Sequence, residues 1–215
     1  MLKQKHIHSF VRWSNIYCHM VTFMLIGFGI YFALGNCSRE IYKKKCTTYY
    51  IDSKSGKDTN KGTSEDFPLR TLQKIEKIQL YPGDTVRFKR GSSFIGPLYI
   101  TNSGDSLSYI TFSDYGNSPP PAFTNPIFDE KKGNFGNCIR IQGSYIVVEN
   151  LYCHHTVAQL PENTGGFTTM WELGAIYIDK QAEYSIIRNN ELFDCGVGIK
   201  SYGRYTLIEN NFIHD

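Results

Sequence analysis

The hydrophobic pattern in the last third of the chain is a short strand that is written three times. The copies begin at Tyr145, Tyr184 and Tyr205 and read YIVVEN, YSIIRN and YTLIEN, with apolar residues inside each copy and an asparagine at its end. The last two copies start 21 residues apart. A step near twenty residues, with β-branched residues and no helix-length apolar run, predicts parallel strands wound in successive coils, a β-solenoid.

The same step predicts which side chains stack from one coil to the next. Alternate residues of a strand share a face, and neighbouring strands lie about 4.8 Å apart. The predicted inward columns are Ile139 over Ile176 over Val197, and Ile141 over Ile178 over Ile199. The predicted outward rows are Glu149, Arg188 and Glu209, whose charges alternate in sign, and Asn150, Asn189 and Asn210, whose amides would form a hydrogen-bonded ladder.

The segment before the coils has the pattern of a cap. A solenoid exposes strand edges and core side chains at its end, so a terminal element has to cover it. Residues 49–52 alternate as a short strand, and residues 71–80 carry Leu72, Ile75 and Ile78 at helical spacing. The sequence therefore predicts one short amphipathic helix that caps the first coil.

The loop between these two elements leaves calcium open as a cofactor. Asp58, Asn60 and Gly62 are similar to the start of a calcium loop, but position 69 is Leu69, where that motif needs a glutamate. A solvated turn is the simpler interpretation.

Several motifs together carry a resemblance to a known family. They are YYID, GKDTNKGTSEDFPLRTL, YPGDTVRFKRG and ITNSGDSLSYITFSDYGN, followed by the coils IIRNN and LIENN. This combination resembles the N-terminal part of secreted right-handed parallel β-helix proteins of the pectate-lyase-like superfamily. The resemblance implies an all-β, right-handed parallel β-helix with a short N-terminal capping helix. Family members are usually longer, so we expect this sequence to be a fragment.

The N-terminus has the order of an export signal. Lys3, Lys5 and Arg12 precede an uncharged apolar run over residues 16–34. We expect a signal peptide or membrane anchor over residues 1–36, and lipidation of Cys37 is a further alternative. A linker over 37–48 and a β-helix domain over 49–215 follow, with the capping segment at 49–90 and the coils at 91–215. The protein is therefore expected to be secreted or held at the cell surface.

Charge and cysteines narrow the range of functions. The formal net charge of +3 comes from the three basic residues of the N-terminal segment, and the rest carries 20 basic and 20 acidic residues. A neutral body does not favour nucleic-acid binding. The cysteines show no metal-binding pair such as C-x-x-C and are expected to be buried singly in the coils. We expect a monomer whose partner is a polysaccharide.

The coil pattern places candidate chemistry on one outward face. Its predicted rows are Arg140, Tyr177 and Gly198, and beside them Gln142, Asp179 and Lys200. An insertion over residues 154–174 would cover this face and contribute His154 and Trp171 to substrate binding. Trp171 would stack on a sugar ring, or else pack the insertion on the coil.

The resemblance implies one set of roles for this face. Uronate lyases of this fold class need a cation that compensates the carboxylate, a base that removes the C5 proton, and a donor for the leaving oxygen. The candidates are Lys200 as base, Tyr177 as donor, and Arg140 or Arg204 as the compensating cation.

Two other functions stay open at the level of the sequence. A glycoside hydrolase would use two carboxylates, for which Asp179 with Glu172 or Asp194 are the candidates. A non-catalytic surface β-helix for glycan binding or adhesion would need neither set of roles. Asp179 and Lys200 would then form only a surface ion pair.

Overall fold

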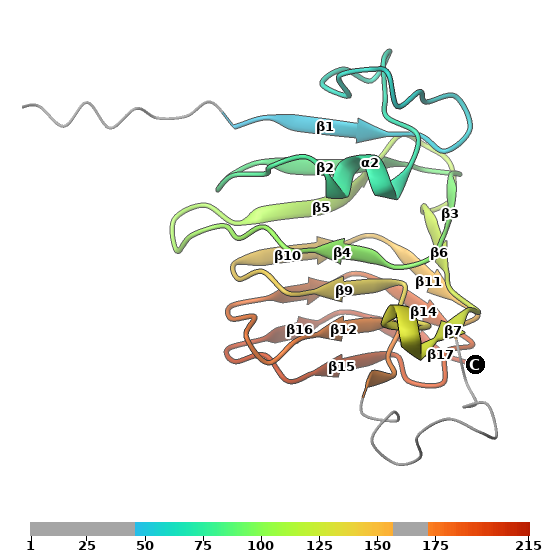
Figure 1. Cartoon of the computed structure of the whole chain (residues 1–215), viewed down its shortest axis with the longest axis vertical. Coiled ribbons are helices and arrows are strands. Elements are labelled where there is room, and N and C mark those ends of the chain that lie inside the picture. The colour runs from blue at the N-terminus through green and yellow to red at the C-terminus, as the bar shows by residue number, and fades with distance from the viewer. Residues whose placement is uncertain (1–45, 157–171) are drawn as a thin grey trace, which may run out of the picture. The chain divides into compact units, whose positions relative to one another are not determined.

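The computed structural model describes residues 46–156 and 172–215, which form an all-β fold of three parallel sheets (Figure 1). Sheet A contains β1 (Thr48–Ile51), β2 (Thr85–Lys89), β5 (Ile110–Tyr115), β10 (Ile146–Glu149), β13 (Ile186–Arg188) and β16 (Leu207–Glu209). Sheet B contains β3 (Ser93–Ile95), β6 (Ala122–Thr124), β11 (Tyr152–His154), β14 (Glu191–Phe193) and β17 (Phe212–His214). Sheet C contains β4 (Leu98–Ile100), β9 (Ile139–Ile141), β12 (Ile176–Ile178) and β15 (Ile199–Ser201).

The chain visits the sheets in the order A, B, C and then returns to A one strand further along. Each circuit is one coil, and this winding is that of a β-helix. The inward columns fill the space between the sheets. Ile139 pairs with Ile176 and Ile141 pairs with Ile178, and all four side chains are fully buried. This part of the predicted core is confirmed.

The predicted register of the last coil is wrong by two residues. Ile199, not Val197, pairs with Ile176, and Ser201 pairs with Ile178. The reason is a turn of unequal length. Tyr184 follows Ile178 by six residues, whereas Tyr205 follows Ser201 by only four, so the 21-residue step holds in sheet A and fails in sheet C. Ile199 still packs against the core from its new place.

The outward charged row of sheet A follows the prediction. Glu149, Arg188 and Glu209 are neighbours on adjacent strands, and Arg188 Nε donates to Glu149 at 2.8 Å. Tyr145 and Tyr184 stack with ring centroids 4.8 Å apart, and Tyr205 continues the stack at 4.7 Å.

The asparagine ladder exists one residue later than predicted. Asn150, Asn189 and Asn210 have positive φ angles and turn the chain from sheet A to sheet B. The next residue then points inward. The Asn190 amide donates to the carbonyl of Val148 and to Asn211, and its oxygen accepts from the Leu151 amide. The ladder is therefore formed by Asn190 and Asn211.

Replacement of Asn190 by alanine is expected to lower the free energy of unfolding by about 2–3 kcal/mol. Asn190 is 1% exposed, so its removal leaves the Leu151 amide and the Val148 carbonyl without their buried partner. Urea unfolding measures the change. Asn189→Gly is the matched control, because glycine tolerates the positive φ. Equal losses of unfolding free energy in the two variants would show that the buried Asn190 contributes no more to stability than Asn189 does.

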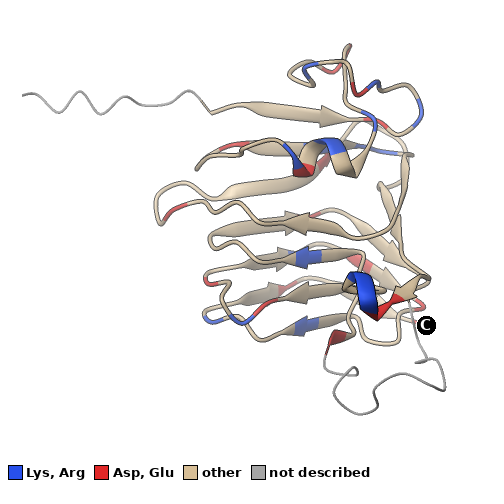
Figure 2. Cartoon of the chain, in the orientation of Figure 1, with Lys and Arg blue, Asp and Glu red and all other residues tan. Residues whose placement is uncertain are grey.

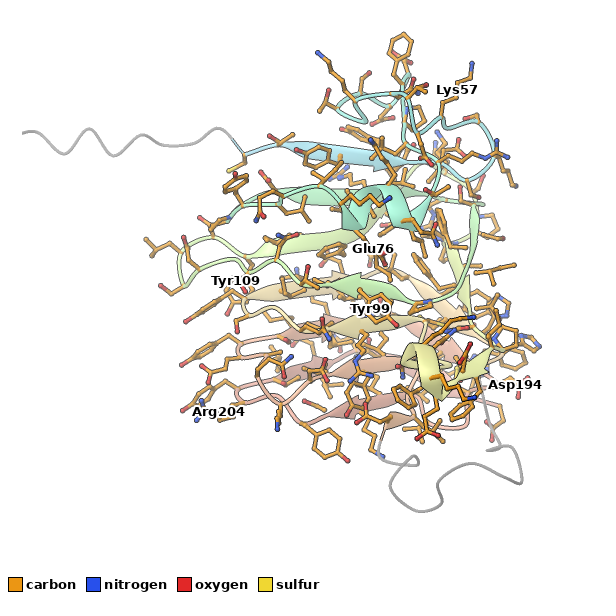
Figure 3. All side chains as sticks on the ribbon, viewed as in Figure 1. Lys57, Glu76, Tyr99, Tyr109, Asp194 and Arg204 are labelled. Carbon is orange, nitrogen blue, oxygen red and sulfur yellow. The ribbon has the colours of Figure 1, made fainter. Side chains whose placement is uncertain are left out.

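The capping helix is present and shorter than predicted. Helix α2 (Leu72–Glu76) begins at Thr71, whose hydroxyl accepts from the Lys74 amide, and it buries Leu72 and Ile75. Glu76 accepts from the backbone amide of Tyr99 at 2.8 Å, so the helix occupies the position next to β4 in sheet C (Figure 3). The chain leaves the helix after residue 77 and buries Leu80.

Asp58 has a structural role in the loop before this helix. Its carboxylate accepts from the amides of Arg70 and Thr71 and from the Thr71 hydroxyl. Burial alone would raise the pKa of Asp58, but these hydrogen bonds outweigh it and the pKa is lowered. The carboxylate therefore holds the start of α2 in place.

The predicted N-terminal segment of residues 1–36 lies outside the described residues. Within residues 46–156 and 172–215, no helix has both the length and the apolar character that a bilayer crossing needs. Among the cysteines, Cys138 and Cys153 are buried as predicted, whereas Cys46 is exposed.

Candidate functional site

Two long segments, here called insertions, connect a strand of sheet B to the next strand of sheet C. The first, residues 125–138, contains β7 (Phe128–Asp129), the short helix η1 (Glu130–Lys132) and β8 (Asn134–Phe135). The second lies between β11 and β12, in the next coil. Both segments lead into the starts of sheet C strands, β9 and β12, and residues 157–171 of the second lie outside the described residues.

The outward face of sheet C has one continuous row of aromatic and basic side chains. Tyr99, Arg140, Tyr177 and Lys200 occupy equivalent positions on β4, β9, β12 and β15. Figure 2 shows the basic positions on β9 and β15. The corrected register thus brings Lys200 into the row of Arg140 and Tyr177, in the place predicted for Gly198. The predicted stacking of Lys200 on Asp179 is wrong.

Arg140 holds two carboxylates at once. Its Nε and Nη2 donate to Asp179 at 3.1 and 2.8 Å, and Nη2 also lies 2.8 Å from Oε2 of Glu172. That second contact is an ion pair outside hydrogen-bond geometry, since the buried Oε2 accepts no hydrogen bond from the described residues. The side chains of Arg140 and Asp179 are only 12% and 11% exposed.

These contacts fix the charge state of the arginine. Burial opposes the charge on Arg140, but hydrogen bonding to Asp179 and the negative charges of both carboxylates outweigh it, so the pKa of Arg140 is raised. The guanidinium also lies 4.6 Å from the ring centroid of Tyr177 and 5.7 Å from that of Phe135. Arg140 is therefore a fixed cation around which the two carboxylates are arranged.

A pocket of about 340 Å³, here called the sheet C pocket, opens beside this cluster. Its lining residues are Glu172, Tyr177, Asp179, Lys180, Gln181 and Tyr202. Burial, together with the negative charge of Glu172, raises the pKa of Tyr177 well above that of a free tyrosine. The phenol therefore stays protonated and is available as a hydrogen-bond donor. Two carboxylates, a phenol and the half-exposed ring of Tyr202 thus share one concave surface.

Asn137 ties the first insertion to the backbone of residues 172–174. The side chain is 2% exposed, and its amide donates to the backbone carbonyls of Glu172 at 3.0 Å and Gly174 at 2.7 Å. Its own carbonyl accepts from the fully buried Asn125. The backbone that carries Glu172 is therefore held by the first insertion. No sequence pattern predicts this role, because an asparagine in a loop has many possible partners.

The structure brings together only part of the predicted site. Arg140, Tyr177, Asp179 and Lys200 lie on one face, with Glu172 beside them. Arg204 instead pairs with Glu183 in the turn before sheet A, and Figure 3 shows it on the opposite side from Asp194. Trp171 lies outside the described residues.

The remaining predicted residues do not line the pocket. His154 is on sheet B, where its ring stacks on Tyr152. Gln142 directly follows β9 and does not line the pocket. Asp194 lies 3.4 Å from His155, so the carboxylate that accompanies Asp179 is Glu172.

Comparison with known proteins finds similarity to proteins of two named activities. No family model matches it. A curated lacto-N-biosidase from Bifidobacterium longum subsp. longum is 42% identical over 76 residues, which is 34% of this chain and 5% of that protein. The solved GH136 lacto-N-biosidase from Eubacterium ramulus has a TM-score of 0.52 at 21% identity, over 77% of this chain and 30% of that one. A rhamnogalacturonan lyase has a TM-score of 0.51 at 17% identity, over 68% and 36% of the two chains.

These similar structures have β-helix-type folds, and the parallel sheets of this chain agree with them. At these identities the likeness is one of fold. The chain spans about a third or less of the length of each solved structure named here and a far smaller part of the curated relative.

Proposed function

We propose that this chain is a carbohydrate-active protein and that the sheet C pocket hydrolyses a glycosidic bond. The observation that carries the proposal is the pair of carboxylates, Glu172 and Asp179, held by one arginine at the wall of one pocket. The names of the similar proteins support a glycan substrate, and the local similarity to a lacto-N-biosidase supports hydrolysis. Such glycans lie outside cells, which agrees with the proposed export signal.

The spacing of the carboxylates favours a double-displacement mechanism. Two oxygens that each lie 2.8 Å from the same Arg140 nitrogen are separated by no more than twice that distance. Retaining glycosidases place their carboxyl groups about 5–5.5 Å apart, whereas inverting enzymes need about 6.5–9.5 Å to admit a water molecule. The geometry thus corresponds to the retaining arrangement.

The contacts of the two carboxylates suggest their roles. Asp179 is oriented by two hydrogen bonds from Arg140, as a nucleophile has to be. Glu172 has a more exposed side chain, at 32%, and only an ion contact, so it can exchange protons as acid and base. Tyr177 would donate to a sugar oxygen, and the ring of Tyr202 would pack against the sugar.

Elimination at an acidic glycan is less well supported. In that mechanism a free cation has to compensate the uronate carboxylate. Arg140, whose guanidinium lies 4.6 Å from the ring centroid of Tyr177, is already opposed by two carboxylates. A substrate without a carboxylate therefore suits this pocket better.

Product analysis tests the proposal. The protein is incubated with a lacto-N-biose glycoside, with neutral polysaccharides, and with alginate and polygalacturonate. Hydrolysis predicts new reducing ends without unsaturated product. An unsaturated product that absorbs in the ultraviolet would instead establish elimination. Binding without turnover of any glycan would establish the non-catalytic alternative.

A further inference from the structure

A second concave surface lies at the corner between sheet A and sheet B. This groove, here called the A–B groove, has a volume of about 340 Å³. Its outward side chains are Arg90, Asn150, Asn189, Glu191, Asn210 and Phe212. None of the residues that line it belongs to the sheet C pocket.

The asparagines of the groove owe their outward direction to the backbone. Asn150, Asn189 and Asn210 have φ angles of 60°, 55° and 52°, a left-handed conformation that asparagine tolerates better than most residues. Asn150 makes one long contact with Ser113, at 3.4 Å. Within the described residues, the carboxamides of Asn189 and Asn210 have no protein hydrogen-bond partner. Each therefore offers a donor and an acceptor to a ligand.

The charged side chains of the groove are already paired. Arg90 binds Asp114 at 2.5 Å, and Glu191 lies 3.2 Å from His214. The free polar groups are thus neutral amides. Phe212, which is 62% exposed, lines the same groove. Neutral amides next to an aromatic ring are the groups that pair with sugar hydroxyls and pack on the C–H face of a sugar ring.

We propose that the A–B groove binds a neutral oligosaccharide, at a site separate from the sheet C pocket. Asn150, Asn189 and Asn210 belong to three successive coils, so they span two strand spacings, about 10 Å in total. That length accommodates a disaccharide or a trisaccharide along the axis of the coils. An acidic glycan would meet Glu191 without a free cation to compensate it.

Saturation-transfer NMR tests this site with neutral trisaccharides, namely cellotriose, xylotriose and triacetylchitotriose, and with trigalacturonate as the acidic comparison. We expect binding of a neutral trisaccharide and none of trigalacturonate. Asn189→Gly combined with Asn210→Gly removes both carboxamides and keeps the backbone conformation. Loss of their hydrogen bonds should weaken binding about tenfold, with an unchanged melting temperature.

Two further variants separate this site from the rest of the protein. Asp194→Gly alters an exposed residue with a similar φ, 49°, outside the groove, and should leave binding intact. Glu172→Gln alters the sheet C pocket and should also leave binding intact. The proposal is overturned if no neutral trisaccharide binds, if binding survives the double asparagine variant, or if Glu172→Gln abolishes it. The first two results would leave the proposed hydrolysis at the sheet C pocket untouched.

Discussion

Replacement of Asp179 by asparagine is expected to lower the turnover of a cleavable glycoside about 10³-fold or more. Asparagine keeps the shape of the side chain and one acceptor for Arg140 but lacks the nucleophilic carboxylate oxygen. Glu172→Gln should also slow the reaction, by about 10²–10⁴-fold, because it removes the acid that protonates the leaving group. Initial rates on the substrate found in the product analysis give both values.

The leaving group separates the two roles. An activated aryl glycoside needs little protonation, so Glu172→Gln should retain far more activity on it than Asp179→Asn. Glu183→Gln is the control, because this carboxylate pairs with Arg204 away from the pocket. Full activity of Asp179→Asn on every substrate, or equal losses in the control, would exclude the proposed pair.

Replacement of Arg140 by methionine is expected to lower the free energy of unfolding by about 3–5 kcal/mol. The change leaves Asp179, which is 11% exposed, and the nearby Glu172 without their common cation. Removal of one partner from a buried ion pair leaves an uncompensated charge, and that is what makes the loss large. Urea unfolding at neutral pH measures it.

Arg188→Met provides the comparison for this prediction. Arg188 also pairs with a carboxylate at 2.8 Å, that of Glu149, but its side chain is 40% exposed. An exposed pair is worth about 0–1 kcal/mol. Similar losses of unfolding free energy in the two variants would mean that burial of the Arg140 cluster does not determine how much it contributes to stability.

The coil architecture could be predicted because its signal is periodic. Ile139, Ile141, Ile176 and Ile178 alternate at strand spacing in two copies, and both copies occupy the predicted columns. The prediction failed where the period is broken. The turn between Ile178 and Tyr184 is two residues longer than the equivalent turn between Ser201 and Tyr205. The spacing of the two tyrosines does not reveal this difference, because it gives only the total length of the coil.

Another part of the site could not be predicted, because it depends on contacts that no local sequence pattern indicates. Arg140, Tyr177 and Asp179 follow from the coil register, so the sequence placed them on one face. Glu172 reaches that face through an insertion whose backbone Asn137 holds from another insertion. Such a contact joins residues far apart in the chain, and the pattern of either segment alone does not indicate it.

The stereochemistry of the reaction tests the account most directly. Proton NMR of the first-formed product reports the configuration at the anomeric carbon before it equilibrates. Because one arginine nitrogen lies 2.8 Å from an oxygen of Glu172 and 2.8 Å from an oxygen of Asp179, as the short carboxylate spacing of retaining enzymes requires, retained configuration is predicted. An inverted product, or an unsaturated sugar in its place, would contradict the mechanism.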